Sequence, residues 1–157
     1  MAKRRIKLIV VPLGILWRNG ISESDVMLIS TENNNFRHYL YIKDGKPAGV
    51  MTLQKREKYN FWSRYYNTQD ISTTNSTPNV TLIQSFHPLY KDNHLTWQPV
   101  WGGVVSLNKG EYQSVKIRTK NELRDPTAYV KAKDSIYFFF DAPDMTMDDK
   151  IEILPQK

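Results

Sequence analysis

The feature that most constrains the fold is a series of short segments rich in β-branched and aromatic residues, separated by turn residues. Long runs of strong helix formers do not occur, so the helix content is expected to be low. Short strands with frequent turns predict an all-β domain with antiparallel strands, either a sandwich or a barrel. The expected strands are residues 6–17, 25–30, 36–43, 48–54, 58–67, 79–87, 94–101, 103–107, 112–119, 127–131 and 135–141.

Three turn sequences separate these strands. Asn19-Gly20 and Asp44-Gly45 are typical of two-residue hairpin turns. Asn108-Lys109-Gly110 predicts a three-residue turn with its glycine in the left-handed conformation. Each of these turns favours strands that are neighbours in one antiparallel sheet.

The length of 157 residues suits one compact domain. We expect residues 1–14 to form a basic N-terminal arm and the first strand, and residues 15–142 to form the β domain. Residues 143–157 are expected to be a C-terminal tail that packs on a neighbour or on the domain surface, because Asp144, Asp148 and Asp149 interrupt any core face. Three aliphatic residues of this tail could form a last short strand: Ile151, Ile153 and Leu154.

The N-terminal segment combines positive charge with an apolar run at residues 8–17, as the first two regions of a signal peptide do. No small-x-small cleavage site follows and Arg18 comes directly after the run, so we expect a buried strand, too short to span a bilayer. The net charge of +6 leaves two interpretations open, ordinary solubility or an anionic partner. Any nucleic-acid binding by the arm would be weak and salt-sensitive. Its cations are Lys3, Arg4, Arg5 and Lys7.

The sequence has no recognisable catalytic or metal-binding motif. There is no cysteine, and the histidines His38, His87 and His94 lack the i, i+2 or i, i+4 spacing of local metal pairs. The acidic tail lacks the turn glycine of a calcium loop. Gly102-Gly103 is not part of a phosphate loop, and no serine lies in a nucleophile elbow. We therefore expect no catalytic residues, no metal and no cofactor, with the histidines in structural or surface positions.

An aromatic segment is more informative. Tyr59, Phe61 and Tyr65 alternate onto one face of the strand expected at 58–67, whereas Trp62 and Tyr66 lie on the other. A strand that is buried on one side only would carry polar residues on its second face. Two interpretations stay open: the domain core on one face and a subunit partner on the other, or a strand buried between two sheets of one domain.

Several segments resemble the tumour necrosis factor ligand family and the related globular heads of complement-type trimers. WGGVVSLNKGEYQSVKI from Trp101 and DSIYFFFDA at 134–142 are similar to the strands of the C-terminal half of that family. KYNFWSRY from Lys58 looks like its central aromatic strand, and ILWRN from Ile15 like its early tryptophan strand. The resemblance spans about residues 15–141.

The sequence also departs from this family. Lys58 stands where the family has glycine, Glu111 replaces an aspartate, and the last strand lacks a glycine between its aromatic residues. The resemblance implies a jelly-roll β-sandwich that associates as a homotrimer about an aromatic axis. The subunit interface would include Tyr59, Phe61, Trp62, Tyr65, Tyr66, Tyr137 and Phe139.

Two classes of function follow. The first is a non-enzymatic structural or attachment protein of a symmetric assembly, such as a virion capsid or spike subunit, with itself and neighbouring structural proteins as partners. Its basic arm would meet nucleic acid or an acidic surface, such as the acidic tail of a neighbour. The second is a secreted homotrimer that binds a cell-surface receptor. Neither class involves insertion into a membrane, and the expected location is the virion or, in the second class, the extracellular space.

Overall fold

The computed structural model describes residues 13–30, 35–43, 46–56, 61–68, 79–107 and 112–157. Within these ranges the strands are antiparallel and helix is scarce, which confirms the all-β prediction. The elements are α1 Leu13–Arg18, a short 3-10 helix η1 Glu23–Asp25, β1 Val26–Ile29, β2 Phe36–Lys43, β3 Lys46–Arg56, β4 Phe61–Thr68, β5 Val80–Lys91, β6 His94–Ser106, β7 Ser114–Arg118, β8 Leu123–Arg124, β9 Ala128–Lys131, β10 Ser135–Asp141 and β11 Glu152–Gln156.

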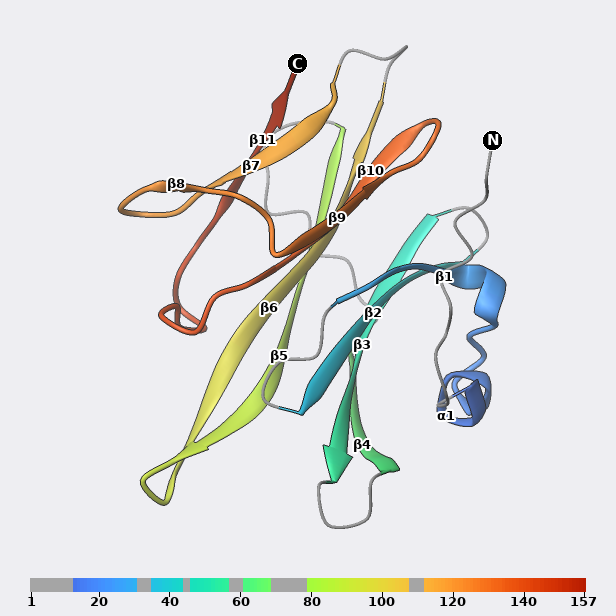
Figure 1. Ribbon diagram of the computed structural model, residues 1–157, viewed down its shortest axis with the longest axis vertical. Helices are drawn as coiled ribbons and strands as arrows, with labels where there is room; N and C mark the ends of the chain where they lie inside the picture. Colours follow the sequence, from blue (N-terminus) through green and yellow to red (C-terminus); the bar gives the residue numbers. More distant parts are fainter. Residues whose placement is uncertain (1–12, 31–34, 44–45, 57–60, 69–78, 108–111) are drawn as a thin grey trace.

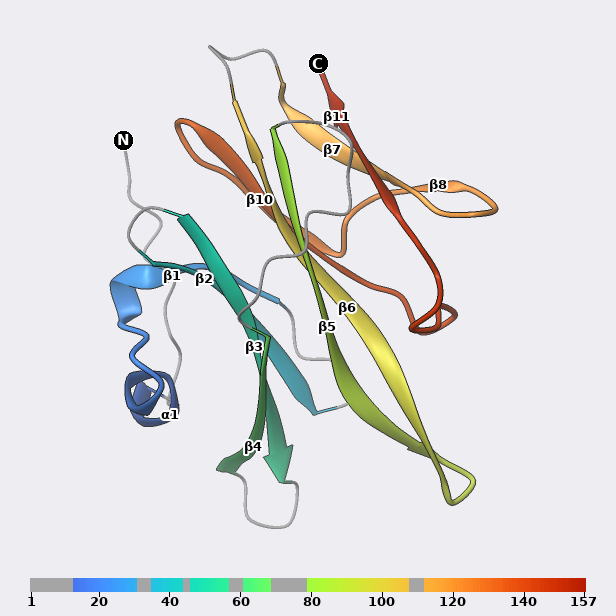
Figure 2. The same cartoon turned by 180° about the vertical axis from the view of Figure 1, so that it is seen from behind.

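The strands of the described residues form three sheets. Sheet A has the order β1-β2-β3-β4, sheet B the order β5-β6-β10-β9, and sheet C the order β11-β7-β8. Figure 1 shows sheet B in the middle, with sheet A and α1 on one side and sheet C on the other. Figure 2 shows the same succession of layers from behind.

The central part of sheet B contributes to two cores, since successive side chains of a strand point to opposite sides and another sheet covers each side. Phe139 points into an inner core between sheets A and B, where it packs with Leu40 and Val50. Its neighbour Phe138 points into an outer core between sheets B and C, where it packs with Ile117 and Ile153. A strand of sheet B can therefore carry apolar residues on both faces because sheet A covers one face and sheet C the other, within the same chain.

The outer face of sheet A is covered by α1, where the sequence predicted a strand. Leu16 is fully buried there against sheet A, whereas Trp17 is exposed. Gly20, with φ of 74°, ends the helix: its N–H donates to the carbonyl of Trp17, and the N–H of Ile21 donates to that of Leu16. This pair of bonds is a Schellman motif. The Asn19-Gly20 sequence thus terminates a helix and does not connect two strands, which corrects both predictions.

The C-terminal segment belongs to the fold. β11 pairs with β7, with Ile153 opposite Ile117, and Ile151 and Ile153 are buried in the outer core. Both terminal guanidinium nitrogens of Arg124, Nη1 and Nη2, donate hydrogen bonds to the carboxylate of Asp144 at 2.8 and 2.6 Å. The last short strand expected within the C-terminal tail is therefore present as β11, the edge strand of sheet C, and one aspartate of the tail already has a cationic partner.

The strand order bears on the expected jelly roll. A jelly roll is built from two Greek keys spread over two packed sheets. In sheet A, by contrast, four consecutive strands lie side by side as a meander. The packed antiparallel sheets agree with a β-sandwich character, whereas the jelly-roll connectivity and the trimer gain no support from this order.

Candidate functional site

The longest hairpin of sheet B runs beyond sheet C. β5 and β6 pair without interruption from Val80 opposite Val105 to Lys91 opposite His94. The connecting residues Asp92 and Asn93 have φ of 50° and 62°, the left-handed values that a two-residue type I′ turn requires. Asp and Asn tolerate this conformation better than other non-glycine residues. Figure 1 shows the tip of this hairpin projecting past β7, β8 and β11.

One face of the projecting part is apolar and exposed. Tyr90 and Leu95 are cross-strand partners, and Trp97 lies two residues further on the same face. They are 70%, 46% and 44% exposed. We call these three residues the hairpin patch. The ring of Phe86 meets that of Trp97 edge-on, with centroids 5.2 Å apart, so a neighbouring ring on the same face orients the tryptophan.

Sequence reasoning missed the hairpin patch because the expected strands ended at 87 and resumed at 94. Pro88 lies just past the expected end at 87, yet it is part of β5, which is the edge strand of sheet B and can accommodate a residue without an N–H. The sequence does contain a signal for this hairpin: the Asp92-Asn93 pair is typical of a two-residue turn, and apolar residues alternate with other residues on both sides of it.

The two described strands that carry predicted interface residues belong to different sheets, β4 to sheet A and β10 to sheet B. Tyr59 lies outside the described residues, and so do the side chains of Phe61, Trp62, Tyr65 and Tyr66 on β4, so their interface role stays a prediction. β4 is an edge strand that pairs with β3. The basic arm, with Lys3, Arg4, Arg5 and Lys7, also lies outside the described residues.

Two further interface candidates lie on β10. Tyr137 is half-buried and packs against the inner core. Phe139 is completely buried in that core, between the two sheets of its own chain. Its ring is therefore inaccessible to a partner, and its assignment to a subunit interface was wrong.

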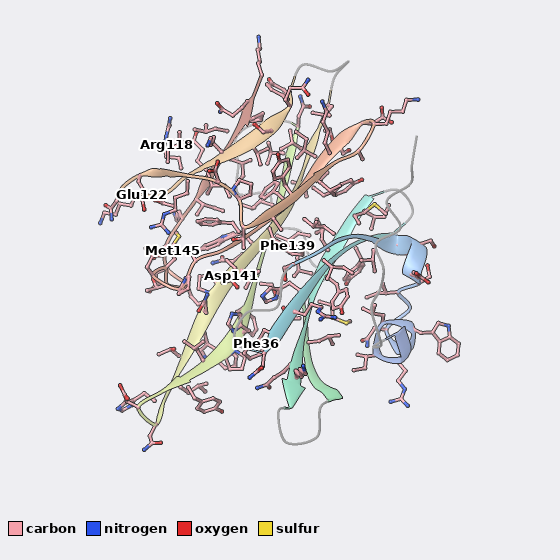
Figure 3. All side chains as sticks on the ribbon, viewed as in Figure 1. Phe36, Arg118, Glu122, Phe139, Asp141 and Met145 are labelled. Carbon is pink, nitrogen blue, oxygen red and sulfur yellow. The ribbon has the colours of Figure 1, made fainter. Side chains whose placement is uncertain are left out.

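A buried polar cluster lies at one end of the inner core. His38 comes from β2 of sheet A, and His87 and Asp141 come from β5 and β10 of sheet B. Their side chains are 1%, 0% and 4% exposed. Figure 3 shows Asp141 and Phe36 near the place where β2 meets sheet B, and the ring centroid of Phe36 lies 4.3 Å from that of His87. The local spacing of the histidines could not reveal this cluster, because three strands of two sheets build it.

The electrostatics of the cluster follow from its burial. Burial lowers the pKa of His87 below its usual range, although the nearby carboxylate of Asp141 opposes this shift. Burial alone would raise the pKa of Asp141, but the attraction of His38 and His87 and a hydrogen bond from Gln98 hold that pKa below its usual value. Burial thus opposes charge on the imidazole of His87, whereas the two histidines favour charge on the carboxylate of Asp141.

In the described part of the chain, no helix has both the length and the apolar character needed to cross a membrane. No family model, no curated protein and no solved structure matches this chain.

Proposed function

We propose that the protein is a non-enzymatic structural or attachment subunit of a symmetric assembly, most simply a virion capsid or spike subunit. The observation that carries this proposal is the hairpin patch, because it offers exposed aromatic surface on a rigid projecting support. Its occupant is a neighbouring subunit of the same assembly.

The chemistry of the patch favours a protein partner. Tyr and Trp are enriched among the residues that dominate protein interfaces, and contiguous exposed apolar surface commonly marks a binding site. Covering a large apolar side chain contributes on the order of 1.5–3 kcal/mol when its burial is complete. Tyr90, Leu95 and Trp97 start from 44–70% exposure, so together they offer a few kcal/mol to a partner.

The ordered structure of the hairpin favours binding at the hairpin patch. The ladder between β5 and β6 continues to the turn, and the ring contact with Phe86 orients Trp97 before a partner arrives. A side chain that is already ordered loses less conformational entropy on binding. The hairpin patch therefore suits repeated association with identical neighbours.

The remaining parts of the proposal rest on the sequence. The jelly-roll resemblance and the homotrimer are supported by the aromatic segment that includes Trp62 and Tyr65 of β4, an edge strand that a neighbouring chain could meet. The basic arm would contact an acidic surface of a neighbour. Asp148 is exposed and suits this contact, whereas Asp144 is occupied by Arg124.

The alternative of a secreted receptor-binding trimer uses the same patch against a receptor. Native mass spectrometry of the purified chain separates the two: a large closed oligomer supports the assembly, and a trimer that does not grow supports the ligand. A strictly monomeric chain at all accessible concentrations would contradict both.

The role of the patch is tested by Trp97→Ser and Tyr90→Ser. The matched controls are Trp17→Ser and Tyr129→Ser, because Trp17 and Tyr129 are also exposed, at 78% and 53%, but lie elsewhere on the surface. We expect the hairpin variants to remain folded and to yield smaller oligomers, with the controls assembling as the wild type does. Unchanged oligomer size in both hairpin variants would refute the proposed contact.

A further inference from the structure

The cluster of His38, His87 and Asp141 places three metal-ligating atoms around one point. His38 Nε2 lies 3.5 Å and His87 Nε2 3.9 Å from Oδ2 of Asp141. One ligand atom from each residue lies within 4.8 Å of the other two. The three residues come from β2, β5 and β10, so any ion held among them would join sheet A to sheet B.

The hydrogen bonds of the histidines determine what their inner nitrogens can offer. Nδ1 of His87 lies 3.4 Å from the carbonyl oxygen of Pro88, and a carbonyl can only accept, so this nitrogen carries the proton. In the neutral ring Nε2 then holds a lone pair. Nδ1 of His38 is hydrogen-bonded to the hydroxyl of Thr52 at 2.7 Å, which leaves Nε2 of His38 as the inner atom.

Both inner nitrogens are buried and have no hydrogen-bond partner among the described residues. Burying a polar atom without a partner is costly, and a lone pair aimed at a carboxylate is also repelled by it. Asp141 Oδ1 is occupied by the amide of Gln98, so Oδ2 is the oxygen that faces the histidines. Nε2 of His87 and Oδ2 of Asp141 are therefore two electron donors that face each other, and Nε2 of His38 is a third donor in the tautomer that donates from Nδ1 to Thr52.

A divalent metal ion satisfies this arrangement. Ligands at about 2.0–2.2 Å from a tetrahedral Zn²⁺ ion lie about 3.3–3.6 Å from one another, close to the separations from Asp141 found here. Metal-bound histidines also commonly hydrogen-bond through their second nitrogen to a carbonyl or another oxygen, as His38 and His87 do. Two imidazoles and one carboxylate suit zinc and its neighbours in the first transition series better than calcium or magnesium.

We propose that His38, His87 and Asp141 bind one divalent transition-metal ion, with Zn²⁺ as the preferred species, and that the ion clamps sheet A to sheet B. A site whose ligands are almost completely buried has no route for a substrate, so its role is structural. Gln98 brings a fourth oxygen close by, because its amide nitrogen donates to Asp141 while its Oε1 is buried without a partner in the described residues. This proposal replaces the expectation of a metal-free chain.

The metal is tested on the full-length, untagged chain, since a histidine tag would itself bind zinc. The protein is stripped with a chelator, dialysed and titrated with Zn²⁺, and bound metal is measured by elemental analysis. Co²⁺ serves as the spectroscopic probe. We expect one bound ion per chain, a visible Co²⁺ spectrum of low-symmetry coordination, and a rise of the thermal midpoint with Zn²⁺ concentration.

The chain supplies its own control, because His94 is exposed at the hairpin turn. His94→Gln should bind one ion as the wild type does, whereas His87→Gln and Asp141→Asn should lose binding and the thermal shift. Thr52→Val, which removes the hydroxyl behind His38, should weaken binding by about 10–100-fold without abolishing it.

Two outcomes would overturn the proposal. One is a folded wild-type chain that binds no Zn²⁺ or Co²⁺ and shows no thermal shift. The other is binding that falls in His94→Gln but persists in folded His87→Gln, which would place the metal on the surface. If the ligand variants fail to fold, the wild-type titrations and His94→Gln still decide the question. Because these readouts do not depend on the hairpin patch, they can fail or succeed independently of the proposed assembly.

Discussion

Two adjacent glycines in β6 give the sharpest test of the layered fold. Gly102 and Gly103 lie opposite Phe139 and Phe138 of β10, and each glycine leaves room for the phenyl ring of its cross-strand partner. Because the two positions face opposite sides of sheet B, alanine at Gly102 would enter the inner core, and alanine at Gly103 the outer core. The two substitutions therefore probe the two interfaces of the same strand separately.

The expected magnitudes differ because the obstructing atoms differ. A Cβ at Gly102 would lie 2.6 Å from Cγ2 of Val50, a side-chain atom. A Cβ at Gly103 would lie 2.5 Å from the ring of Phe138 and 2.7 Å from the carbonyl oxygen of Thr81, which belongs to the backbone of the neighbouring strand. Overpacking destabilises a protein by about 1–3 kcal/mol. Replacing glycine by alanine also lowers the conformational entropy of the unfolded chain, which stabilises the folded state by about 0.4–1 kcal/mol. We expect net losses of about 1–2 kcal/mol for Gly102→Ala and about 2–3 kcal/mol for Gly103→Ala.

Urea unfolding followed by far-UV circular dichroism measures these differences. Losses of this size remain measurable, because domains have stabilities of about 5–15 kcal/mol. Val50→Ala should partly relieve Gly102→Ala, so the double variant should lose less stability than the sum of the single variants. Gly20→Ala is the control for backbone strain without a clash, since no atom lies within 4 Å of its Cβ. Wild-type stability in Gly103→Ala, together with strict additivity at Gly102, would refute the packing of sheet B between two cores.

Two other predictions concern the core and the third sheet. Phe139→Ala should reduce the free energy of unfolding by about 3–5 kcal/mol and leave oligomer size unchanged at concentrations where the chain is folded, and dissociation into stable monomers would contradict its place in the core. The hydrogen bonds from Arg124 lower the pKa of Asp144 from 3.8 to about 2, so this pair stabilises the fold above about pH 4 and ceases to do so as the pH falls toward 2. The stability difference between the wild type and Arg124→Gln, measured by urea unfolding, should therefore narrow over that interval, and a difference that does not depend on pH would contradict the ion pair.

Sequence analysis predicted both ends of two strands correctly. The expected ranges 36–43 and 135–141 coincide with β2 and β10. The expected strands 94–101 and 103–107, by contrast, are one strand, and Gly102 and Gly103 within it leave space for phenyl rings from β10. A glycine in a strand indicates either a break or a close approach, and only the neighbouring strand distinguishes the two.

The apolar run before Arg18 was the principal error in the fold. Within residues 13–18 the structure has a helix, and the sequence offered no alternation to separate helix from strand. The decisive information was the capping chemistry, since the N–H groups of Gly20 and Ile21 complete the Schellman motif. The third sheet was missed for another reason: β8 has only two residues, and the pairing of β11 with β7 depends on contacts distant in sequence.

The buried cluster shows where sequence reasoning reached its limit. A search for metal ligands by local spacing finds nothing, because the ligands converge through sheet register: His87 is the cross-strand partner of Gln98, and Asp141 is that of Val100. The inner faces of five strands, β2, β3, β5, β6 and β10, carry polar residues at one end of the inner core. A buried polar group is costly unless it is satisfied, so several of them gathered at one end of a core need a common partner. That pattern of inward polar residues could have been recognised once the strand pairing was known, and its members are His38, Thr52, Ser85, His87, Gln98 and Asp141.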